Sequence, residues 1–258
     1  MIALSFENAV KRFPGATTNA VDHVSLDIEE GELVTILGAS GSGKTTLLKM
    51  VNRLIEPDEG TIRLFGEDIK DRDPVKLRHG IGYVIQQIGL FPHMTVRENI
   101  ATVPKILKWD KARIDARADE LLALVNLDPA EFRGRYPAQL SGGQQQRVGL
   151  ARALAADPAV MLMDEPFGAI DAINRSNLQA ELLSIHGKHK KTYLFVTHDV
   201  GEALKLGGKV LVMDRGRVKQ FDAPQRIVDD PADDFVRELL DSASGLRERR
   251  RGMNVGIL

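Results

Sequence analysis

The stretch "LGASGSGKTT", Leu37–Thr46, decides the fold because it sets a glycine-rich loop between two regular elements. The apolar run Leu33–Leu37 before it predicts a buried strand, and Lys44–Arg53 after it predicts a helix. Residues Gly38–Thr45 fit the spacing G-x-x-x-x-G-K-[ST]. Glycines let successive backbone N–H groups point at one anion, and the helix start adds its positive end. The stretch therefore predicts a phosphate site, and the alternative is a flexible Gly/Ser turn.

The residue types of this loop indicate how a nucleoside triphosphate and magnesium are held. Lys44 reaches the β- and γ-phosphates, and the Thr45 hydroxyl ligates magnesium. The strand before the loop and the helix after it favour this interpretation over a flexible turn. The residues predicted to bind the nucleotide here are Gly38, Ala39, Ser40, Gly41, Ser42, Gly43, Lys44, Thr45 and Thr46.

Two carboxylates, Asp164 and Glu165, follow a second apolar strand that is predicted at Val160–Met163. In open α/β sheets, ligands bind at the carboxyl ends of the strands. Asp164 is therefore predicted to hold magnesium, directly or through water, and Glu165 to activate the attacking water. The alternative is a strand end with two solvated acids, and the phosphate loop upstream favours the catalytic interpretation.

Further apolar runs alternate with helical patterns along the chain. A region from about Leu90 to Ala156 is predicted to be helical, with Asp110 as an N-cap. One helical face there is formed by Ile114, Ala118, Leu121, Leu122 and Val125. Strands are predicted at Ile2–Phe6, Val24–Ile28, Thr61–Phe65, Ile81–Ile85, Thr192–Thr197 and Val210–Met213, and a helix at Asn174–Ile185. Continuous apolar strands between helices indicate an α/β core with a mostly parallel sheet, interrupted by a helical insert.

A second helix start with small polar residues lies in "AQLSGGQQQRVGLARALAAD". Ser141–Gln144 open this helix, which is predicted to run to Asp157–Pro158, and its free N–H groups form another anion site. Two arrangements explain two such helix starts in one chain. One nucleotide is sandwiched within the chain, or two chains lie head to tail and each completes the site of the other.

These stretches together resemble the nucleotide-binding subunit of the ATP-binding cassette (ABC) transporters. The resemblance rests on the signature "LSGGQ", Leu140–Gln144, followed by "QQRV", and extends from about Ile2 to about Leu240. The other landmarks occur in the family's order around it: the phosphate loop, Gln86 in "GYVIQQIGLFPH", the Walker B pair Asp164–Glu165, the D-loop Asp171 in "FGAIDA" and the switch histidine His198 in "FVTHD".

The resemblance implies an α/β fold of the P-loop NTPase (RecA-like) kind, with a mostly parallel sheet, an antiparallel β part and an inserted helical subdomain. It implies an ABC ATPase domain over residues 1–241 with the helical insert at about 88–157. Residues 242–258 then form a short basic C-terminal tail.

The resemblance also implies roles for single residues. Phe13 stacks on adenine, with an ordinary core phenylalanine as the alternative. The Gln86 amide contacts magnesium or the lytic water and senses a neighbouring subunit. His198 donates to the γ-phosphate and holds Glu165 in line, and Asp171 lies at a dimer interface. The implied catalytic residues are Glu165, His198, Gln86 and Lys44, the metal ligands are Thr45, Gln86 and Asp164, and the signature contacts are Ser141, Gly142, Gly143 and Gln144.

The implied assembly is a head-to-tail homodimer that closes on two ATP molecules, each between one phosphate loop and the signature of the other chain. Closure drives a change in separate transmembrane permease subunits, which work with a periplasmic or extracellular solute-binding protein. The expected docking surface for the permease is the helical insert with Gln87–Ile100.

The segment "QQIGLFPH" is similar to the cassettes of importers for quaternary amine osmoprotectants such as glycine betaine and choline. An importer for another small solute, an amino acid or a polyamine, is the first alternative. A cassette ATPase of DNA repair, chromosome structure or translation is the second. That class usually has paired cassettes, long coiled coils or zinc-binding cysteines, and this sequence has no cysteine.

The composition and the apolar runs of the 258-residue chain limit which partners and which cellular location we expect. A formal net charge of −1 gives no basic excess for a general nucleic-acid grip, so no nucleic-acid partner is expected. The N-terminal residues do not resemble a signal peptide, and no apolar run has the length of a spanning helix. We expect a cytoplasmic protein, peripheral on the inner face of the membrane. The tail motif "LRERRRG" is interpreted either as a solvated helix end or as a contact with anionic lipid.

Overall fold

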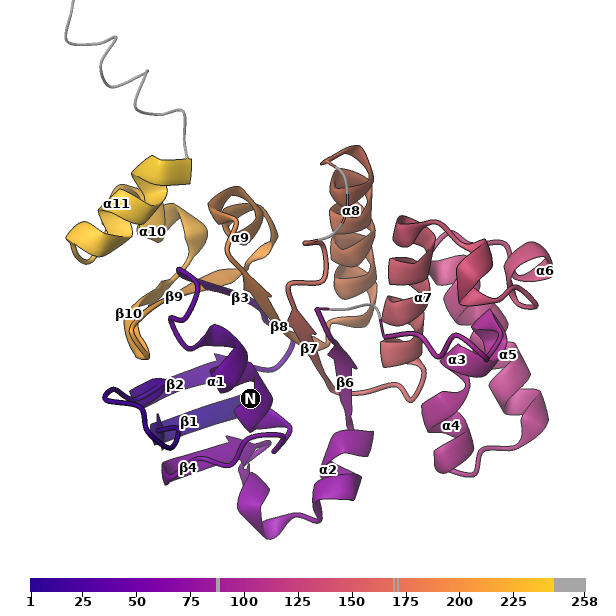
Figure 1. Cartoon of the computed structure of the whole chain (residues 1–258), viewed down its shortest axis with the longest axis horizontal. Helices are drawn as coiled ribbons and strands as arrows, with labels where there is room; N and C mark the ends of the chain where they lie inside the picture. The colour runs from indigo at the N-terminus through magenta and orange to yellow at the C-terminus, as the bar shows by residue number, and fades with distance from the viewer. Residues whose placement is uncertain (87–88, 169, 171, 244–258) are drawn as a thin grey trace, which may run out of the picture. The chain divides into compact units, whose positions relative to one another are not determined.

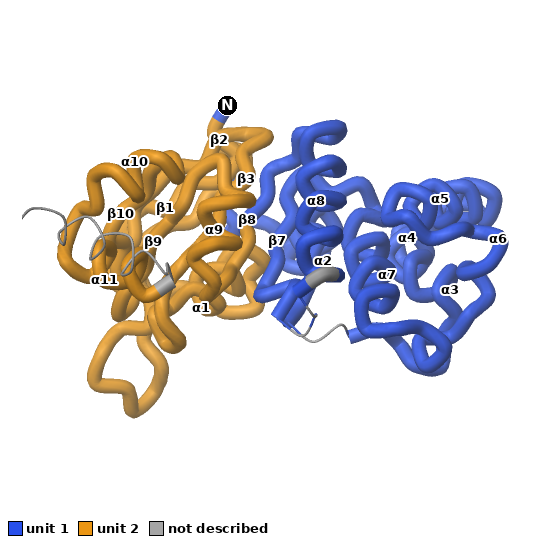
Figure 2. The backbone as a smooth tube through the Cα atoms, turned by 90° about the horizontal axis from the view of Figure 1, so that it is seen from above, with its two compact units in different colours: residues 1, 67–194 blue, residues 2–66, 195–258 orange. Residues whose placement is uncertain are grey.

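A computed structural model of the chain describes residues 1–86, 89–168, 170 and 172–243. Its elements are shown in Figure 1. The chain divides into two compact units, coloured in Figure 2. Unit 1 contains residue 1 and residues 67–194, and unit 2 contains residues 2–66 together with the described part of 195–258. Strand β8 (Thr192–Thr197) crosses the boundary between them.

The N-terminal half of unit 2 is an antiparallel sheet. Strand β1 (Ile2–Lys11) pairs on one side with β2 (Val21–Glu29) and on the other with β4 (Glu59–Leu64). The register of β1 shifts between Phe6 and Ala9, which marks a β-bulge. The bulge breaks the alternation of buried and exposed side chains. For this reason β1 continues well past the Phe6 end that the sequence pattern predicted.

The other strands of unit 2 surround the glycine-rich loop. Strand β3 (Leu33–Leu37) is buried along its whole length and runs parallel to β9 (Lys209–Asp214). Strand β9 turns back into the antiparallel β10 (Arg217–Asp222) through Arg215 and Gly216, which both have positive φ. Two positive φ angles in a two-residue loop match the right-handed twist of a hairpin. Strand β10 was not predicted, because its side chains are polar and only partly buried.

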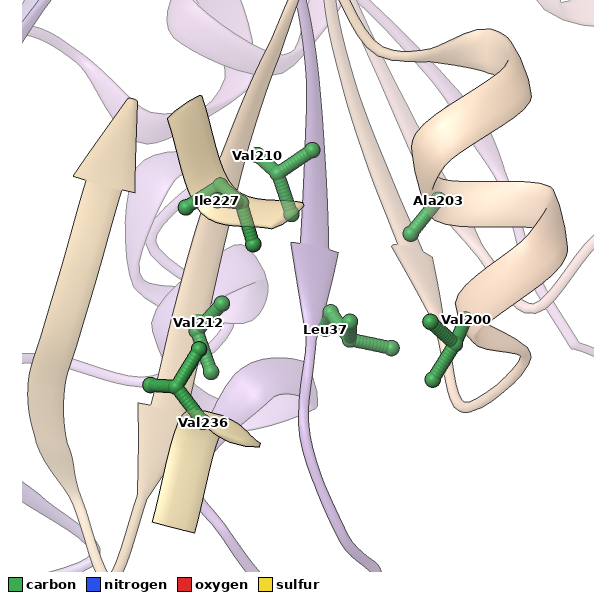
Figure 3. Packing of buried hydrophobic residues seen from close by; sticks show 7 residues of the cluster. All are labelled: Leu37, Val200, Ala203, Val210, Val212, Ile227 and Val236. Carbon is green, nitrogen blue, oxygen red and sulfur yellow. The ribbon is translucent and has the colours of Figure 1, made fainter. Parts of the chain in front are cut away.

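Helices cover the β3–β9 pair and enclose an apolar cluster, shown in Figure 3. Leu37 of β3 faces Val200 and Ala203 of α9, and the cluster continues through β9, α10 and α11. Leu37, the residue just before the glycine-rich loop, is therefore fixed by packing. The helices of unit 2 are α1 (Lys44–Val51), α9 (Val200–Leu206), α10 (Pro224–Asp229) and α11 (Asp234–Ala243).

Unit 1 contains the second strand pair. Strand β6 (Ile81–Val84) runs parallel to β7 (Val160–Asp164), with Val84 opposite Met163. The carboxyl ends of both strands therefore meet at one edge. The remaining elements are β5 (Glu67–Asp68), η1 (Ile69–Asp71), α2 (Pro74–His79), α3 (Val96–Ile100), α4 (Thr102–Ile106), α5 (Lys111–Leu124), α6 (Pro129–Phe132), η2 (Pro137–Gln139), α7 (Gly142–Leu154) and α8 (Ala172–His189).

The helical region was predicted largely correctly. Within the described residues 89–157 every regular element is helical, and helices α3 to α7 gather together in Figure 1. The Asp110 carboxylate accepts from the Arg113 N–H at 2.8 Å and caps α5, and the five residues of the predicted apolar face are buried. Helix α7 ends at Leu154, before the predicted Asp157–Pro158, and Asp157 has a left-handed φ of 55°.

The fold is α/β with parallel and antiparallel strand pairs, as the sequence predicted. The boundaries of the helical insert at about 88–157 stay a prediction, because unit 1 also holds β6, β7 and α8. Among the described residues, no helix has both the length and the hydrophobicity needed to cross a membrane.

Candidate nucleotide site

The loop between β3 and α1 has a backbone that only glycine accommodates at two positions. Gly43 has a φ of 101°, and a Cβ there would lie 2.2 Å from the Ala20 carbonyl oxygen. A Cβ on Gly38 would lie 2.2 Å from the Met213 carbonyl oxygen. Both glycines of the motif are therefore required by close approaches of backbone from other segments of the chain. The loop is a preformed turn and not a flexible linker.

Lys44 extends over this loop and is held there. Its side chain is 5% exposed, and Nζ donates to the carbonyl oxygens of Gly38 at 2.7 Å and of Ala39 at 2.8 Å. These bonds hold a fixed positive charge against the loop, next to the N-terminus of α1. The geometry is compatible with an anion bound in the loop, and anion binding stays a prediction. Thr45 and Thr46 follow on the first turn of α1 and are partly exposed.

The β9–β10 turn forms a hydrogen bond with the glycine-rich loop, and the sequence patterns did not predict this contact. The Gly216 N–H donates to the Ser42 carbonyl oxygen at 3.0 Å, and the Asp22 N–H donates to the Gly216 carbonyl oxygen at 2.9 Å. The Asp22 side chain accepts from Arg217 Nε at 2.5 Å and from Asn19 at 2.7 Å. These hydrogen bonds, that of Asn19 first, lower the pKa of Asp22. The only sequence signal was the turn glycine of "DRGR".

A hollow of about 830 Å³ lies beside the loop in unit 2. It reaches Gly41 and is bordered by the segment Ala16–Ala20. Cationic side chains outnumber the anionic ones in its lining. Phe13 is not among the residues that line it: its side chain is 41% exposed, and Lys11 Nζ lies 5.9 Å from its ring centroid. The side chains that border the hollow include Arg12, Thr17, Thr18, Asp214, Arg215 and Lys219.

His198 stands directly after β8 and is exposed. The next residue, Asp199, caps α9, since its carboxylate accepts from the Glu202 N–H at 3.0 Å. Its own N–H donates to the Thr197 hydroxyl oxygen at 3.0 Å. These two bonds fix the backbone around the histidine.

In unit 1, the carboxylates lie at the carboxyl end of β7. Asp164 is 5% exposed, and Glu165 has a left-handed φ of 45° that turns the chain sharply. Tyr83 on the paired strand β6 lies close enough to respond to Asp164: burial first, and then the Asp164 charge, raises the pKa of Tyr83 to about 12. No sequence motif singled out this tyrosine. A positive φ is unfavourable for a glutamate, which is typical of functional sites.

Gln86 and Glu165 are brought together. The Gln86 Nε2 amide donates to Glu165 Oε2 at 3.4 Å. The donor nitrogen therefore faces the carboxylate, and the amide oxygen, the atom suited to a metal ion, is the other terminal atom. Thr45, Gln86 and Asp164 offer hydroxyl, amide and carboxylate oxygens, the donor types that magnesium prefers. Thr45 belongs to unit 2, and Gln86 and Asp164 to unit 1.

The signature residues start helix α7 with a capping box. Ser141 Oγ accepts from the Gln144 N–H at 3.3 Å, and Gln144 Oε1 accepts from the Ser141 N–H at 2.9 Å. Helix geometry leaves the N–H groups of Gly142 and Gly143 without intrahelical acceptors. A Cβ at either glycine would meet nothing within 4 Å, so no other part of the chain packs against these two positions. The arrangement fits the predicted anion contact.

Some predicted residues lie outside the described part of the chain. They are Asp171 and, from the expected docking segment, Gln87 and Ile88. Residues 244–258 of the predicted tail also lie outside it.

Comparison with known proteins identifies the family. A family model described as "ABC transporter" matches residues 21–168. The chain belongs to the ABC transporter family. Among solved structures, a post-hydrolysis dimer of the ATP-binding cassette MJ0796 bound to ADP and Pi has a TM-score of 0.76 and 34% identity, and covers 86% of this chain and 98% of its own. The cassette cbiO1 from Clostridium perfringens has a TM-score of 0.83 and 26% identity, with 99% of each chain covered.

Several relatives of this ABC chain are import proteins for osmoprotectants. The osmoprotectant import ATP-binding protein OsmV of Salmonella typhimurium is 53% identical over 236 residues, which are 90% of this chain and 62% of that protein. The glycine betaine uptake system ATP-binding protein YehX of Escherichia coli is 52% identical and matches 91% of this chain and 75% of that protein. The chain spans about three fifths of the length of OsmV.

Proposed function

We propose that this chain binds ATP with magnesium, hydrolyses it, and thereby powers uptake of a quaternary amine osmoprotectant through a separate permease. The observation that carries the proposal is the position of Glu165. Its carboxylate lies beside the Gln86 amide at the end of a buried strand, in a chain whose β3–α1 loop is shaped for phosphate.

Nucleotide binding rests on the loop Gly38–Thr46. Lys44 supplies the positive charge, and the start of α1 supplies N–H donors. The hollow beside Gly41 has room for the nucleoside part, and Ala16–Ala20 would border it. Phe13 would stack on adenine from its exposed position.

Hydrolysis rests on Glu165, which we assign as the general base that accepts a proton from the attacking water. Gln86 orients that carboxylate through the hydrogen bond at 3.4 Å, and His198 donates to the γ-phosphate. Thr45, Gln86 and Asp164 would hold magnesium, which neutralises phosphate charge when bound. Lys44 stabilises the negative charge on the transferring phosphoryl group.

We propose a head-to-tail homodimer in which Ser141, Gly142, Gly143 and Gln144 of one copy face the nucleotide of the other. The open N-terminus of α7 and its unpaired N–H groups support this. The dimeric MJ0796 cassette, a structural relative, supports it too. Asp171 would lie at the interface.

The solute and the other subunits are proposed from the relatives. Their names give osmoprotectant import and glycine betaine uptake. We propose the same solute class here, with permease subunits docked on the helical insert and a solute-binding protein outside. The cassette would then occupy residues 1–241 on the cytoplasmic face of the membrane. An importer for an amino acid or a polyamine is the alternative.

The test is uptake of labelled solutes by the native host at high salt. Glycine betaine and choline are offered in parallel with an amino acid and a polyamine. The wild type is compared with a chromosomal Glu165→Gln variant and with a matched control, Glu56→Gln, whose carboxylate forms a surface ion pair with Arg53. We expect Glu165→Gln alone to lose betaine or choline uptake. Unchanged uptake of both would refute the proposed solute class, and loss of another solute would replace it.

A further inference from the structure

The segment Gly89–Thr95 follows the loop that carries Gln86 and has no regular secondary structure. Two side chains from two different helices of unit 1 nevertheless fix it. Asn99 of α3 and Arg152 of α7 both form hydrogen bonds with its backbone. Neither residue was singled out by the sequence patterns.

Asn99 is 0% exposed and all of its polar atoms are used on this segment. Its Oδ1 atom accepts from the Phe91 N–H at 2.8 Å. Its Nδ2 atom donates to the carbonyl oxygens of Phe91 at 3.2 Å, Met94 at 3.1 Å and Thr95 at 3.0 Å. A buried amide that is fully satisfied by one segment fixes its backbone. Asn99 therefore fixes the backbone of this segment against helix α3.

Arg152 makes the second connection. Its Nη1 atom donates to the Gly89 carbonyl oxygen at 2.6 Å, and its guanidinium lies 5.9 Å from the Phe91 ring centroid. Burial lowers the pKa of Arg152, and an arginine still keeps its charge at neutral pH. The bond to Gly89 is thus charge-assisted, and such bonds are stronger than neutral ones.

Helix α7 joins this contact to the signature residues. It begins at the Ser141 capping box and carries Arg152 near its end, with about 16 Å of helix between them. Helix α3 packs against α7. A displacement of Ser141–Gln144 therefore moves Arg152. Through its hydrogen bond, Arg152 then displaces the carbonyl group of Gly89, which lies three residues after Gln86.

We infer that Arg152 is a positioning residue that makes the segment Gly89–Thr95 move together with helix α7. When Ser141–Gln144 close on nucleotide, the resulting movement of α7 therefore displaces the loop after Gln86. The inference rests on the proposed function in one respect, that nucleotide is bound against Ser141–Gln144. Arg152 does not act on the nucleotide itself. It transmits the position of helix α7 to the segment Gly89–Thr95 through its charge-assisted hydrogen bond to the Gly89 carbonyl oxygen.

The test compares hydrogen exchange in the full-length protein with and without MgATP, in a Glu165→Gln background that retains ATP. The variants are Arg152→Met, which keeps an unbranched stem without the donor, and Arg152→Lys, which keeps a charged donor. The matched control is Arg117→Met. Arg117 also donates to carbonyl oxygens in unit 1, those of Leu154 at 3.0 Å and Ala155 at 3.4 Å, and within the described part of the chain it forms no hydrogen bond or ion pair with residues 89–95.

In the parent and in Arg117→Met, we expect MgATP to slow exchange in both 141–154 and 89–95. In Arg152→Met, the response of 141–154 should remain, while that of 89–95 shrinks about fivefold to tenfold. Arg152→Lys should restore part of it. A full response of 89–95 in Arg152→Met overturns the inference, and so does an equal loss in Arg117→Met.

Failure of the proposed function gives a different result. If MgATP leaves 141–154 unchanged in the parent protein, the nucleotide does not act on the signature, and the proposed ATP sandwich is wrong. In the reconstituted importer, Arg152→Met should also lower the solute transported per ATP hydrolysed by about the same factor. A merely structural defect would lower both rates together and leave that ratio unchanged, which would contradict a positioning role.

Discussion

The Nε2 amide of Gln86 lies 3.4 Å from Oε2 of Glu165, so the loop after β6 contacts the carboxyl end of β7. The parallel register explains why they meet, since Val84 stands opposite Met163, and Gln86 and Glu165 each lie two residues further along the chain. An amide beside a carboxylate limits how that carboxylate turns. The proposed base is thus contacted by Gln86, which lies three residues before the segment that Arg152 is inferred to position.

Replacement of Glu165 by glutamine should separate ATP binding from hydrolysis. The amide keeps the size of the side chain but accepts no proton, so we expect hydrolysis to fall about a hundredfold to ten-thousandfold. ATP affinity should stay within about threefold, because the loop Gly38–Thr46 is untouched. Phosphate release and equilibrium nucleotide titration measure the two quantities. Normal turnover would mean that another residue is the base.

Replacement of Lys44 by alanine should weaken ATP binding by about tenfold to a hundredfold, the usual cost of one charged hydrogen-bonding partner. The matched control is Lys49→Ala, on the last turn of the same helix α1. Fluorescent-nucleotide titration measures both. Equal affinities in the wild type and Lys44→Ala would contradict the assignment of the phosphate loop.

Replacement of Gly43 by alanine should disturb the phosphate loop. The new Cβ would lie 2.2 Å from the Ala20 carbonyl oxygen at a φ of 101°, so the backbone must move. We expect a loss of about 2–4 kcal/mol in unfolding free energy and weaker ATP binding. Gly187→Ala is the control, because its site in α8 is open and alanine favours a helix. Urea denaturation compares them, and equal stability would argue against the strain.

Replacement of Tyr193 by phenylalanine should change how stability depends on pH. The Tyr193 hydroxyl is buried with no hydrogen-bond partner among the described residues, and burial raises the pKa of Tyr193. Its neutral form is therefore favoured in the folded state. The contribution of Tyr193 to the free energy of unfolding is fully present below about pH 10, the pKa of tyrosine in the unfolded chain, and it is lost as the pH rises above that value.

In the Tyr193→Phe variant, the free energy of unfolding should decrease less at alkaline pH than in the wild type. At neutral pH it should be higher by up to about 1 kcal/mol, since an unpaired buried hydroxyl is removed. Tyr83, with a pKa of about 12, leaves a smaller dependence in place. Urea denaturation at about pH 7 and pH 10.5 measures this, with Tyr136→Phe as an exposed control. A variant less stable than the wild type at both pH values would show that the hydroxyl has a partner.

The sequence predicted best those elements that a single rule determines. Leu33–Leu37 and Thr192–Thr197 were correct to the residue, because both are buried throughout and consist of apolar residues and threonine, with aromatic residues in the second, and most of these residue types favour strands. The end of β1 was wrong, because the bulge near Asn8 depends on its pairing with β2 and not on its own pattern. Strand β10 was missed because it is paired but mostly polar.

In the candidate site too, residues that follow local sequence rules were predicted, and residues that depend on contacts elsewhere in the chain were not. The positions of Lys44, Asp164 and Ser141 follow from local rules for loops, strand ends and helix caps, and they were placed by motif. Gly216 and Asn99 act through hydrogen bonds to segments that lie elsewhere in the chain or in an irregular loop. No local pattern marks such a residue, since its partner is chosen by the fold. Whether Asp171 has its expected role stays a prediction.

The support of Ser42 by Gly216 has a consequence for the order of folding. The phosphate loop is complete in the sequence by Thr46, but its backing turn is synthesised about 170 residues later. During translation, the loop emerges long before the strand pair that holds it. A nascent chain arrested before β9 should therefore bind nucleotide poorly, and the ability to bind should arise only once Gly216 has left the ribosome. Nucleotide capture would then report that synthesis of the cassette is nearly finished.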